Sequence, residues 1–423
     1  MRLIADRVAQ PRLVEQTVQL ALQQTEFPGS IHWDPLSVAQ GDVGQALLAA
    51  QLAQAFPEAN WAAIANDHFA RAVRALQVPT GLQVSAVSGI SGMAFVGRRL
   101  PDGDRWQSVL TRLDGLVAQA SLGLAAKLHG QSGTAVSTFD LISGLSGVVA
   151  TLLPAAPAQR MPPAVPFLVR ALCRLALADD GLPAWHTPVH LLYDERQMQQ
   201  YPAGNLNCGL AHGIPGPLSA LALTLLSGYE PAEIRPAIRR LAQWLVDHQC
   251  RDDDGPGWSA VVPLHREAEQ LVVADVGELS RDAWCYGTPG VARALYLAGR
   301  ALPDESLCDL AIDAMAAVYR RPPETRGIDS PTFCHGVAGL LQITLRFAHD
   351  TGVPMFDRAT ADLTDQILAR IDPDRPMAIA TVEPGGNLVD QPGLLDGATG
   401  VCLVLLGAAT DREPTWDRLF GLE

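Results

Sequence analysis

The feature that most constrains this chain is a unit that recurs seven times: Gly-x-x-Gly followed by an apolar run rich in Ala, Leu and Val. The chain has 37 glycines in 423 residues. Composition alone predicts about three such pairs, so seven pairs in step with apolar runs indicate a repeat architecture. The seven pairs span residues 41–44, 89–92, 144–147, 213–216, 287–290, 336–339 and 397–400.

The six gaps between these units have room for one further helix each, every gap contains a candidate, and a seventh candidate precedes the first unit. Segment 231–248 is amphipathic, with Ile238 and Leu241 on one face and Arg239 on another, as in a helix that packs one side against a core. The glycine-led runs are apolar all round, which indicates full burial. The candidates for half-exposed helices are 11–25, 61–76, 104–127, 163–177, 231–248, 304–320 and 354–371.

The alternation of half-exposed and buried helices predicts two concentric rings. The expected fold is all-α: an α/α toroid of seven outer and seven inner helices in a single domain over residues 1–423. Inner helices that alternate with outer ones run the same way, so the glycine turns are expected at one end of the barrel. An irregular helical bundle is the alternative that periodicity leaves open.

Two segments break the helical pattern. Residues 178–207 are rich in Pro, His, Gln and Asn and are expected to form a long loop. Residues 250–280 contain Trp-Ser-Ala-Val-Val and Leu-Val-Val stretches, which predict a short β-hairpin near 251–275. Long loops at one rim are where binding sites tend to be built.

Composition narrows the functional classes. Hydrophobic residues make up 48% of the chain and charged residues 18%, which is enough for a large core. The net charge of -14 argues against a nucleic-acid surface, which needs a basic patch. The amino terminus lacks the apolar run of a signal peptide, and the apolar stretch 210–229 opens with His-Gly-Ile-Pro-Gly, as in a loop that leads into a buried helix. We expect a cytoplasmic protein that is not an integral membrane protein, with its seven cysteines as thiols or metal ligands.

The residues just before the glycine turns carry the chemistry. Cys285 stands two residues before Gly287, and Cys334 and His335 directly precede Gly336. Two sulfur ligands and one imidazole are a plausible zinc set with one tetrahedral position left over. Water in that position would give a hydrolase or lyase, and a thiol would become a thiolate nucleophile. Two thiolate ligands weaken zinc as a Lewis acid and favour the thiol.

Three further residues are candidates for proton transfer and charge stabilisation. His212 suits general acid/base work near neutral pH, Asp140 could orient it, and Arg281 could stabilise a developing enolate oxygen. Each has a structural alternative: a core hydrogen bond, a helix cap and a surface ion pair, respectively. Four of the remaining cysteines are expected to be small buried core residues: Cys173, Cys250, Cys308 and Cys402. Cys208 stays open, because it stands near the site in sequence although packing is its favoured role.

These motifs resemble the lanthionine synthetase C family, the lantibiotic cyclases. The resemblance follows the family's order over most of the chain, and its most specific parts are Trp-Cys-Tyr-Gly and Cys-His-Gly. The matching stretches are Asp140-Leu-Ile-Ser-Gly-Leu-Ser-Gly147, Asn207-Cys-Gly-Leu-Ala-His-Gly-Ile-Pro-Gly216, Arg281-Asp-Ala-Trp-Cys-Tyr-Gly-Thr-Pro-Gly290, Cys334-His-Gly-Val-Ala-Gly-Leu-Leu341 and Gly393-Leu-Leu-Asp-Gly-Ala-Thr-Gly400.

The resemblance implies a seven-fold toroid and a Zn²⁺ ion held by Cys285, Cys334 and His335. It implies a stand-alone cyclase that adds a cysteine thiol to dehydroalanine or dehydrobutyrine in the same precursor peptide, which closes a thioether ring. In that chemistry His212, assisted by Asp140, exchanges the proton, and Arg281 with Tyr286 steadies the enolate. The group that protonates the α-carbon stays open. The implied partners are the precursor peptide and a separate dehydratase and transporter.

Three other functions compete with this interpretation. The first is a related zinc protein that binds glutathione or adds it to dehydroamino acids. The second is a toroid glycosidase or terpene-type cyclase, which would need paired carboxylates in the mouth, where only Asp140 stands at a strong position. The third is a non-catalytic scaffold for a dehydratase.

Overall fold

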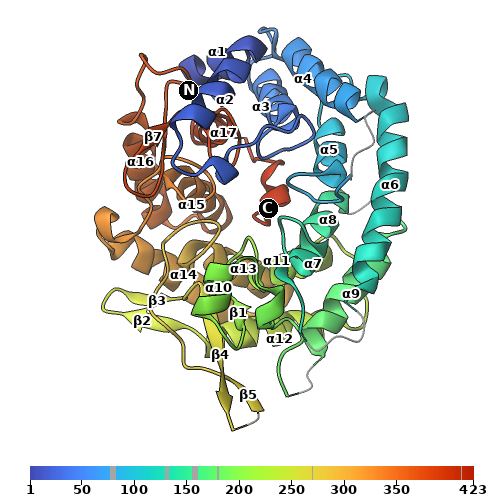
Figure 1. The fold of residues 1–423 in the computed structure, drawn as a ribbon, viewed down its shortest axis with the longest axis vertical. Helices are drawn as coiled ribbons and strands as arrows, with labels where there is room; N and C mark the ends of the chain where they lie inside the picture. Colours follow the sequence, from blue (N-terminus) through green and yellow to red (C-terminus); the bar gives the residue numbers. More distant parts are fainter. Residues whose placement is uncertain (77–81, 129–132, 155–160, 179–180, 269, 411) are drawn as a thin grey trace. The chain divides into compact units, whose positions relative to one another are not determined.

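The computed structural model describes residues 1–423 except 77–81, 129–132, 155–160, 179–180, 269 and 411. Helices dominate the described residues, and the strands are short (Figure 1). The chain forms two compact units, and each is described by itself. Unit 1 consists of Met1–Leu116 and Gly327–Trp416, and unit 2 of Val117–Arg326 and Asp417–Glu423.

Unit 1 is built from helix pairs, since α3 packs against α4 and α15 against α16, while α5 and α17 both contact α3. Helix α6 (Gln107–Ala126) begins in this unit and continues into unit 2. The other elements of unit 1 are α1 (Arg2–Val8), α2 (Pro11–Gln24), η1 (Pro28–Ser30), α3 (Asp42–Ala55), α4 (Trp61–Ala75), α5 (Ile90–Gly97), η2 (Gly103–Trp106), α15 (Val337–Thr351), α16 (Pro354–Leu368), β6 (Thr381–Val382), β7 (Leu388–Val389) and α17 (Ala398–Ala408).

Unit 2 has the same organisation, with α11 against α8, α12 and α13, and α13 against α14. The chain terminus returns to this unit, where η5 contacts α8. Its elements are α7 (Val136–Phe139), α8 (Leu145–Leu152), α9 (Val165–Leu177), η3 (Val189–Leu191), α10 (Glu195–Gln200), β1 (Asn205–Asn207), α11 (Pro215–Leu226), α12 (Ile234–Asp247), β2 (Cys250–Asp252), β3 (Gly255–Gly257), β4 (Val261–Glu267), β5 (Gln270–Val273), α13 (Thr288–Ala301), α14 (Glu305–Arg320), η4 (Pro323–Thr325) and η5 (Asp417–Phe420).

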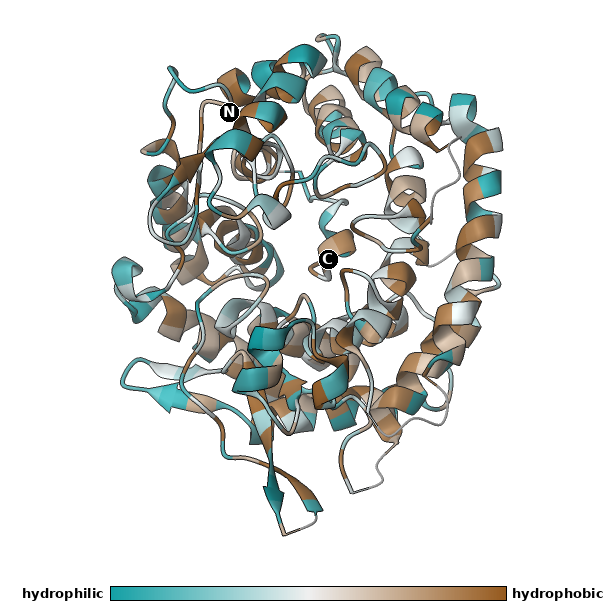
Figure 2. Cartoon of the chain, in the orientation of Figure 1, coloured by the Kyte–Doolittle hydropathy of each residue, from teal (hydrophilic) through white to brown (hydrophobic). Residues whose placement is uncertain are grey.

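The predicted alternation of buried and half-exposed helices is confirmed. All seven glycine-led runs open a helix: α3, α5, α8, α11, α13, α15 and α17. The helices between them begin and end within a few residues of the predicted segments: α2, α4, α6, α9, α12, α14 and α16. Helix α12 buries Ile238 and Leu241 and exposes Arg239, and Figure 2 shows hydrophilic and hydrophobic residues side by side along α6.

Backbone hydrogen bonds join neighbouring glycine turns within each unit. In unit 1, Cys334 N donates to Leu395 O (2.8 Å), Leu394 N donates to Ala39 O (2.6 Å) and Val38 N donates to Val87 O (2.8 Å). In unit 2, Leu141 N donates to Ala211 O (3.2 Å) and Ala211 N donates to Cys285 O (3.2 Å). Every accepting carbonyl belongs to the residue two before a helix-opening glycine. Cys285 and Cys334 therefore occupy equivalent positions in two successive repeats.

Glycine is required where the turns fold back on themselves. Gly287 has a φ of 99°, and a Cβ there would lie 1.6 Å from the carbonyl oxygen of Arg281. A Cβ on Gly336 would lie 2.2 Å from the carbonyl oxygen of Ser330. Real Cβ atoms do not approach oxygen so closely, so these turns exclude any side chain and hold the residues between tightly.

The predicted hairpin is confirmed and lies in a larger sheet. β4 pairs with β5 in antiparallel register, Leu264 opposite Val273, with residue 269 outside the described part. β1 adds a third strand, Leu206 opposite Val262, and β2 with β3 forms a second hairpin that was not predicted. The expected loop 178–207 includes the short α10 and β1, and its residues 179 and 180 lie outside the description.

Among the described residues, no helix is both long enough and apolar enough to cross a lipid bilayer.

Candidate active site and metal ligands

His212 and Asp140 meet in unit 2. The Asp140 side chain is 1% exposed, and its Oδ2 lies 2.6 Å from Nδ1 of His212. Oδ1 accepts hydrogen bonds from the backbone N–H groups of Ser143 and Gly144, both at 2.7 Å. Asp140 thus caps the glycine turn and contacts His212 at the same time. A carboxylate at Nδ1 fixes the proton there and leaves the lone pair on Nε2.

Tyr286 lies beside His212 in the same unit, with ring centroids 6.3 Å apart. Nδ2 of Asn207 donates a hydrogen bond of 3.2 Å to the Tyr286 hydroxyl oxygen, and Oδ1 of Asn207 accepts one from Gly209 N at 2.9 Å. Asn207 therefore positions the phenol relative to the imidazole. It was not among the predicted site residues, although it opens one of the stretches that resemble the family.

Arg281 stands at the start of the turn that carries Cys285. Its side chain is exposed and makes no hydrogen bond or ion pair with the described residues, so the surface ion pair considered as its alternative is not observed. Its neighbour Asp282 is buried, 3.3 Å from Nη1 of Arg321. Burial raises the pKa of the Asp282 carboxyl to about 6, although the charge of Arg321 lowers it. This pair anchors the backbone beneath Arg281.

Cys285 is buried, with 6% of its surface exposed. The preceding Trp284 is fixed in unit 2, because its Nε1 donates to Phe420 O at 3.0 Å and its ring meets the Phe420 ring edge-on at 5.4 Å. The Cys285 carbonyl accepts from Ala211 N. The thiol is therefore carried by a turn whose backbone and flanking side chain are both immobilised.

Cys334 and His335 lie in unit 1, on the turn before α15. Phe333, fully buried, packs 5.8 Å from the Trp416 ring, and Cys334 N is hydrogen-bonded to Leu395 O. Nδ1 of His335 lies 3.5 Å from Oδ1 of Asp396. Of the three predicted metal ligands, these two share a turn in unit 1 and Cys285 belongs to unit 2.

Asp396 was missed from the sequence. It immediately precedes Gly397, as His335 precedes Gly336, and this shared repeat position is the signal that could have identified it. Burial raises the pKa of its carboxyl, while the imidazoles of His335 and His32 lower it. Its Oδ1 is buried and has no hydrogen-bond partner among the described residues.

The other cysteines do not take part in either cluster. Burial raises the thiol pKa to about 12 for each of the three buried ones, Cys173, Cys208 and Cys402, as expected for inert core thiols. The expectation of full burial is wrong for Cys250 and Cys308, which are half-buried. Burial still raises the pKa of both thiols.

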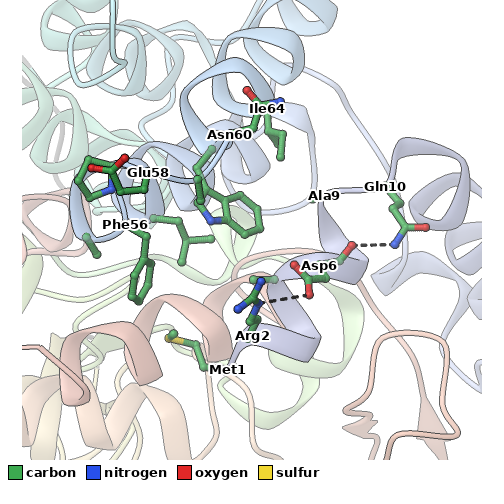
Figure 3. A pocket seen from close by; sticks show the side chains of 15 residues that line it. Met1, Arg2, Asp6, Ala9, Gln10, Phe56, Glu58, Asn60 and Ile64 are labelled. Atoms are coloured by element: carbon green, nitrogen blue, oxygen red, sulfur yellow. Dashed lines mark hydrogen bonds and ion pairs between the residues drawn. The ribbon is translucent and has the colours of Figure 1, made fainter.

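A cavity of about 790 Å³ lies elsewhere in unit 1 (Figure 3). It is lined by α1, the end of α3 and the start of α4, with Phe56 and Trp61 as its aromatic residues and an ion pair between Arg2 and Asp6 at 3.9 Å. Its described lining contains none of the predicted site residues. The volume of this cavity therefore does not identify the residues that are predicted to carry the chemistry.

Comparison with known proteins agrees with the sequence motifs. The family model described as "Lanthionine synthetase C-like protein" matches residues 32–420. The chain is 25% identical over 326 residues to "Nisin biosynthesis protein NisC" of Lactococcus lactis subsp. lactis, which covers 76% of this chain and 73% of that protein.

Among solved structures, "Nisin cyclase" aligns with a TM-score of 0.77 at 21% identity over 97% of both chains. This match shows the fold, and the predicted α/α toroid is confirmed. A GH76A α-1,6-mannanase from Salegentibacter sp. HEL1_6 reaches only 0.40 at 10% identity, over 94% of this chain and 98% of its own, which is too low to carry an argument. The chain belongs to the lanthionine synthetase C-like family.

Proposed function

We propose that this chain is a zinc-dependent lanthionine cyclase. It would add cysteine thiols to dehydroalanine or dehydrobutyrine in a dehydrated precursor peptide and so form (methyl)lanthionine rings. Family membership and the likeness to NisC support this enzyme class. The observation that carries the proposal is the His212–Asp140 pair at 2.6 Å, beside Tyr286, because thiol addition needs proton exchange and a stabilised enolate.

The residues fit the implied zinc ion. We propose Cys285, Cys334 and His335 as its ligands, and two thiols with one imidazole are a group that could hold a metal ion and one that suits zinc. Oδ1 of Asp396, which lacks a hydrogen bond among the described residues and lies 3.5 Å from Nδ1 of His335, also suits a metal-ligating imidazole, whose second nitrogen is held by a carboxylate, a backbone carbonyl or water. When bound, zinc would keep the substrate thiol deprotonated.

The chain's own residues would supply the remaining steps. Nε2 of His212 accepts a proton while Asp140 holds Nδ1. The substrate sulfur forms a bond to the β-carbon, and the π electrons of the dehydroamino acid move to its carbonyl oxygen as an enolate. Arg281 and the Tyr286 hydroxyl would donate hydrogen bonds to that oxygen. A proton then adds to the α-carbon, so the net reaction places S and H across the double bond.

Partner and compartment follow from the same proposal. The substrate would come from a dehydratase, since dehydroalanine and dehydrobutyrine arise by loss of water from Ser and Thr. None of the seven cysteines, all in the described part of the chain, forms a disulfide. This supports the cytoplasm as the predicted compartment, because thiols stay reduced there.

The test uses a peptide that carries one dehydroalanine and one cysteine a few residues apart. Ring closure leaves the peptide mass unchanged and removes one thiol that iodoacetamide can alkylate, so mass spectrometry after alkylation reports it directly. We expect thiol loss with the wild-type chain and much slower thiol loss with His212→Ala. Unchanged thiols on several such peptides would refute the cyclase, a mass gain of one glutathione in a parallel reaction would favour the glutathione alternative, and full activity of His212→Ala would favour the scaffold.

A further inference from the structure

Among the described residues, His212 and His335 each stand directly before a helix-opening glycine and present Nδ1 to a carboxylate from another glycine turn. In unit 2, Nδ1 of His212 faces Asp140 at 2.6 Å. In unit 1, Nδ1 of His335 faces Asp396 at 3.5 Å. We propose that Asp396 is a positioning residue for His335: it holds Nδ1 so that Nε2 is presented as the metal ligand. This inference rests on the proposed function only in taking His335 as a ligand.

The backbone fixes Asp396 relative to the turn of His335. Cys334 N donates to the carbonyl of Leu395 at 2.8 Å, so the residues just before His335 and Asp396 are directly joined. Thr381 Oγ1 donates to the backbone carbonyl of Asp396, and Leu395 N donates to Ala39 O at 3.3 Å. With the main chain held from three sides, the carboxylate has little room to turn away from the imidazole.

The carboxylate is also incompletely satisfied. Asp396 Oδ1 is buried and lacks a hydrogen-bond partner among the described residues, and only 25% of the side chain is exposed. A buried acceptor without a hydrogen bond is destabilising. A small rotation of the imidazole would bring the 3.5 Å separation to the roughly 2.7–2.9 Å of a charge-assisted hydrogen bond, and Nδ1–H is the nearest suitable donor.

The chemical consequence is a fixed tautomer. A neutral imidazole carries one N–H, and a carboxylate at Nδ1 keeps the proton there and the lone pair on Nε2. The same contact orients the ring and raises the basicity of the ligand nitrogen. His32 also contributes to the field at Asp396, but its side chain is exposed and it stands outside the Cys-His turn. Asp396 is thus not a ligand itself, and it affects metal binding through its contact with His335.

The experiment measures zinc affinity of the purified full chain by competition with a colorimetric chelator. We expect Asp396→Ala to bind zinc about 10–100-fold more weakly and Asp396→Asn to fall between, because its amide oxygen can still accept from Nδ1–H. Asp34→Asn is the matched control: it removes one negative charge from another glycine-turn segment of unit 1, keeps an acceptor for Leu36 N, and should bind zinc like the wild type. His335→Ala is the reference for a lost ligand.

Thermal unfolding of the zinc-free variants shows whether weaker zinc binding is caused by a loss of folding. If Asp396→Ala does not fold, the zinc affinity of Asp396→Asn is the test of the proposal. Wild-type affinity in the Asp396 variants, with binding lost in His335→Ala, overturns the positioning role and leaves the zinc site standing. Wild-type affinity in His335→Ala overturns both the positioning role and the ligand set. Weaker binding in Asp396→Ala with partial recovery in Asp396→Asn supports the proposal.

Discussion

Replacing Asp140 by Asn should separate the two tasks of its carboxylate. Oδ1 caps the turn through the N–H groups of Ser143 and Gly144 at 2.7 Å, and Oδ2 faces His212 at 2.6 Å. An Asn side chain has one oxygen that can accept a hydrogen bond. If this oxygen keeps the cap, the NH₂ group must face Nδ1 of His212. A donor at Nδ1 favours the tautomer with the proton on Nε2, which cannot accept a proton from substrate.

The expected magnitudes differ sharply between the two variants of this residue. General acid/base catalysis contributes about 10²–10⁴-fold, so Asp140→Asn should slow ring closure by that factor, about 3–5 kcal/mol of barrier. Its stability should change little, since both cap hydrogen bonds survive. Asp140→Ala leaves two backbone N–H groups without their acceptor, at about 1–3 kcal/mol each, and should lower both rate and stability.

The assay is the rate of thiol loss from the dehydroalanine peptide, read by alkylation and mass spectrometry, together with thermal unfolding of each variant. His212→Ala is the matched control, because its side chain is 37% exposed and its removal should cost rate without much stability. Adding Asp140→Asn to His212→Ala should slow the reaction no further. A wild-type rate for Asp140→Asn would show that the pair plays no part in proton exchange.

Three further outcomes are expected. The wild-type chain should bind about one zinc ion, and Cys285→Ala or Cys334→Ala should lose it in a metal assay; metal-free wild-type protein would refute the site. Gly287→Ala should destabilise the fold by about 3 kcal/mol or more in chemical unfolding, because φ is 99° and the new Cβ would lie 1.6 Å from a carbonyl oxygen. Gly115→Ala, with nothing within 4 Å, should instead stabilise by roughly 0.5–1 kcal/mol. Asp282, with its pKa raised to about 6, binds its proton more tightly when folded. The protonated carboxyl of Asp282 therefore stabilises the folded chain by about 2–3 kcal/mol at most. This stabilisation is present below about pH 4 and is lost as the pH rises to about 6. The difference between wild type and Asp282→Asn should follow that window, and a flat difference would contradict the raised pKa.

The helix starts could be predicted from the sequence because the backbone geometry at these turns requires glycine. Glycine is the residue that fits at Gly287 and Gly336, and the apolar runs behind them are buried on every side. The pair His212 and Asp140 could also be anticipated, since each precedes a turn and the expected barrel brings turns together. The toroid was predicted from the alternation of helices, and the comparison with nisin cyclase confirmed it against an irregular bundle.

The contacts of Asn207 with Tyr286 and of Asp396 with His335 could not be predicted in the same way. Asn and Asp are common before turns, where they usually cap the backbone, so their presence does not indicate which side chain they meet. Asp140 illustrates the difficulty, because it caps its turn and holds a histidine at once. Only the coordinates distinguish these roles.

The repeat also explains why chemistry could be placed at these turns without loss of the fold. The hydrogen bonds that join neighbouring turns use backbone atoms alone, so they do not dictate the side chain two residues before the glycine. That position holds Ala39, Val87, Cys334 and Leu395 in unit 1 and Ile142, Ala211 and Cys285 in unit 2. If this is right, Cys285→Ala and Cys334→Ala should fold as stably as the zinc-free wild type while losing the metal. Unfolding of either variant would mean that the thiol is needed for packing as well as for ligation.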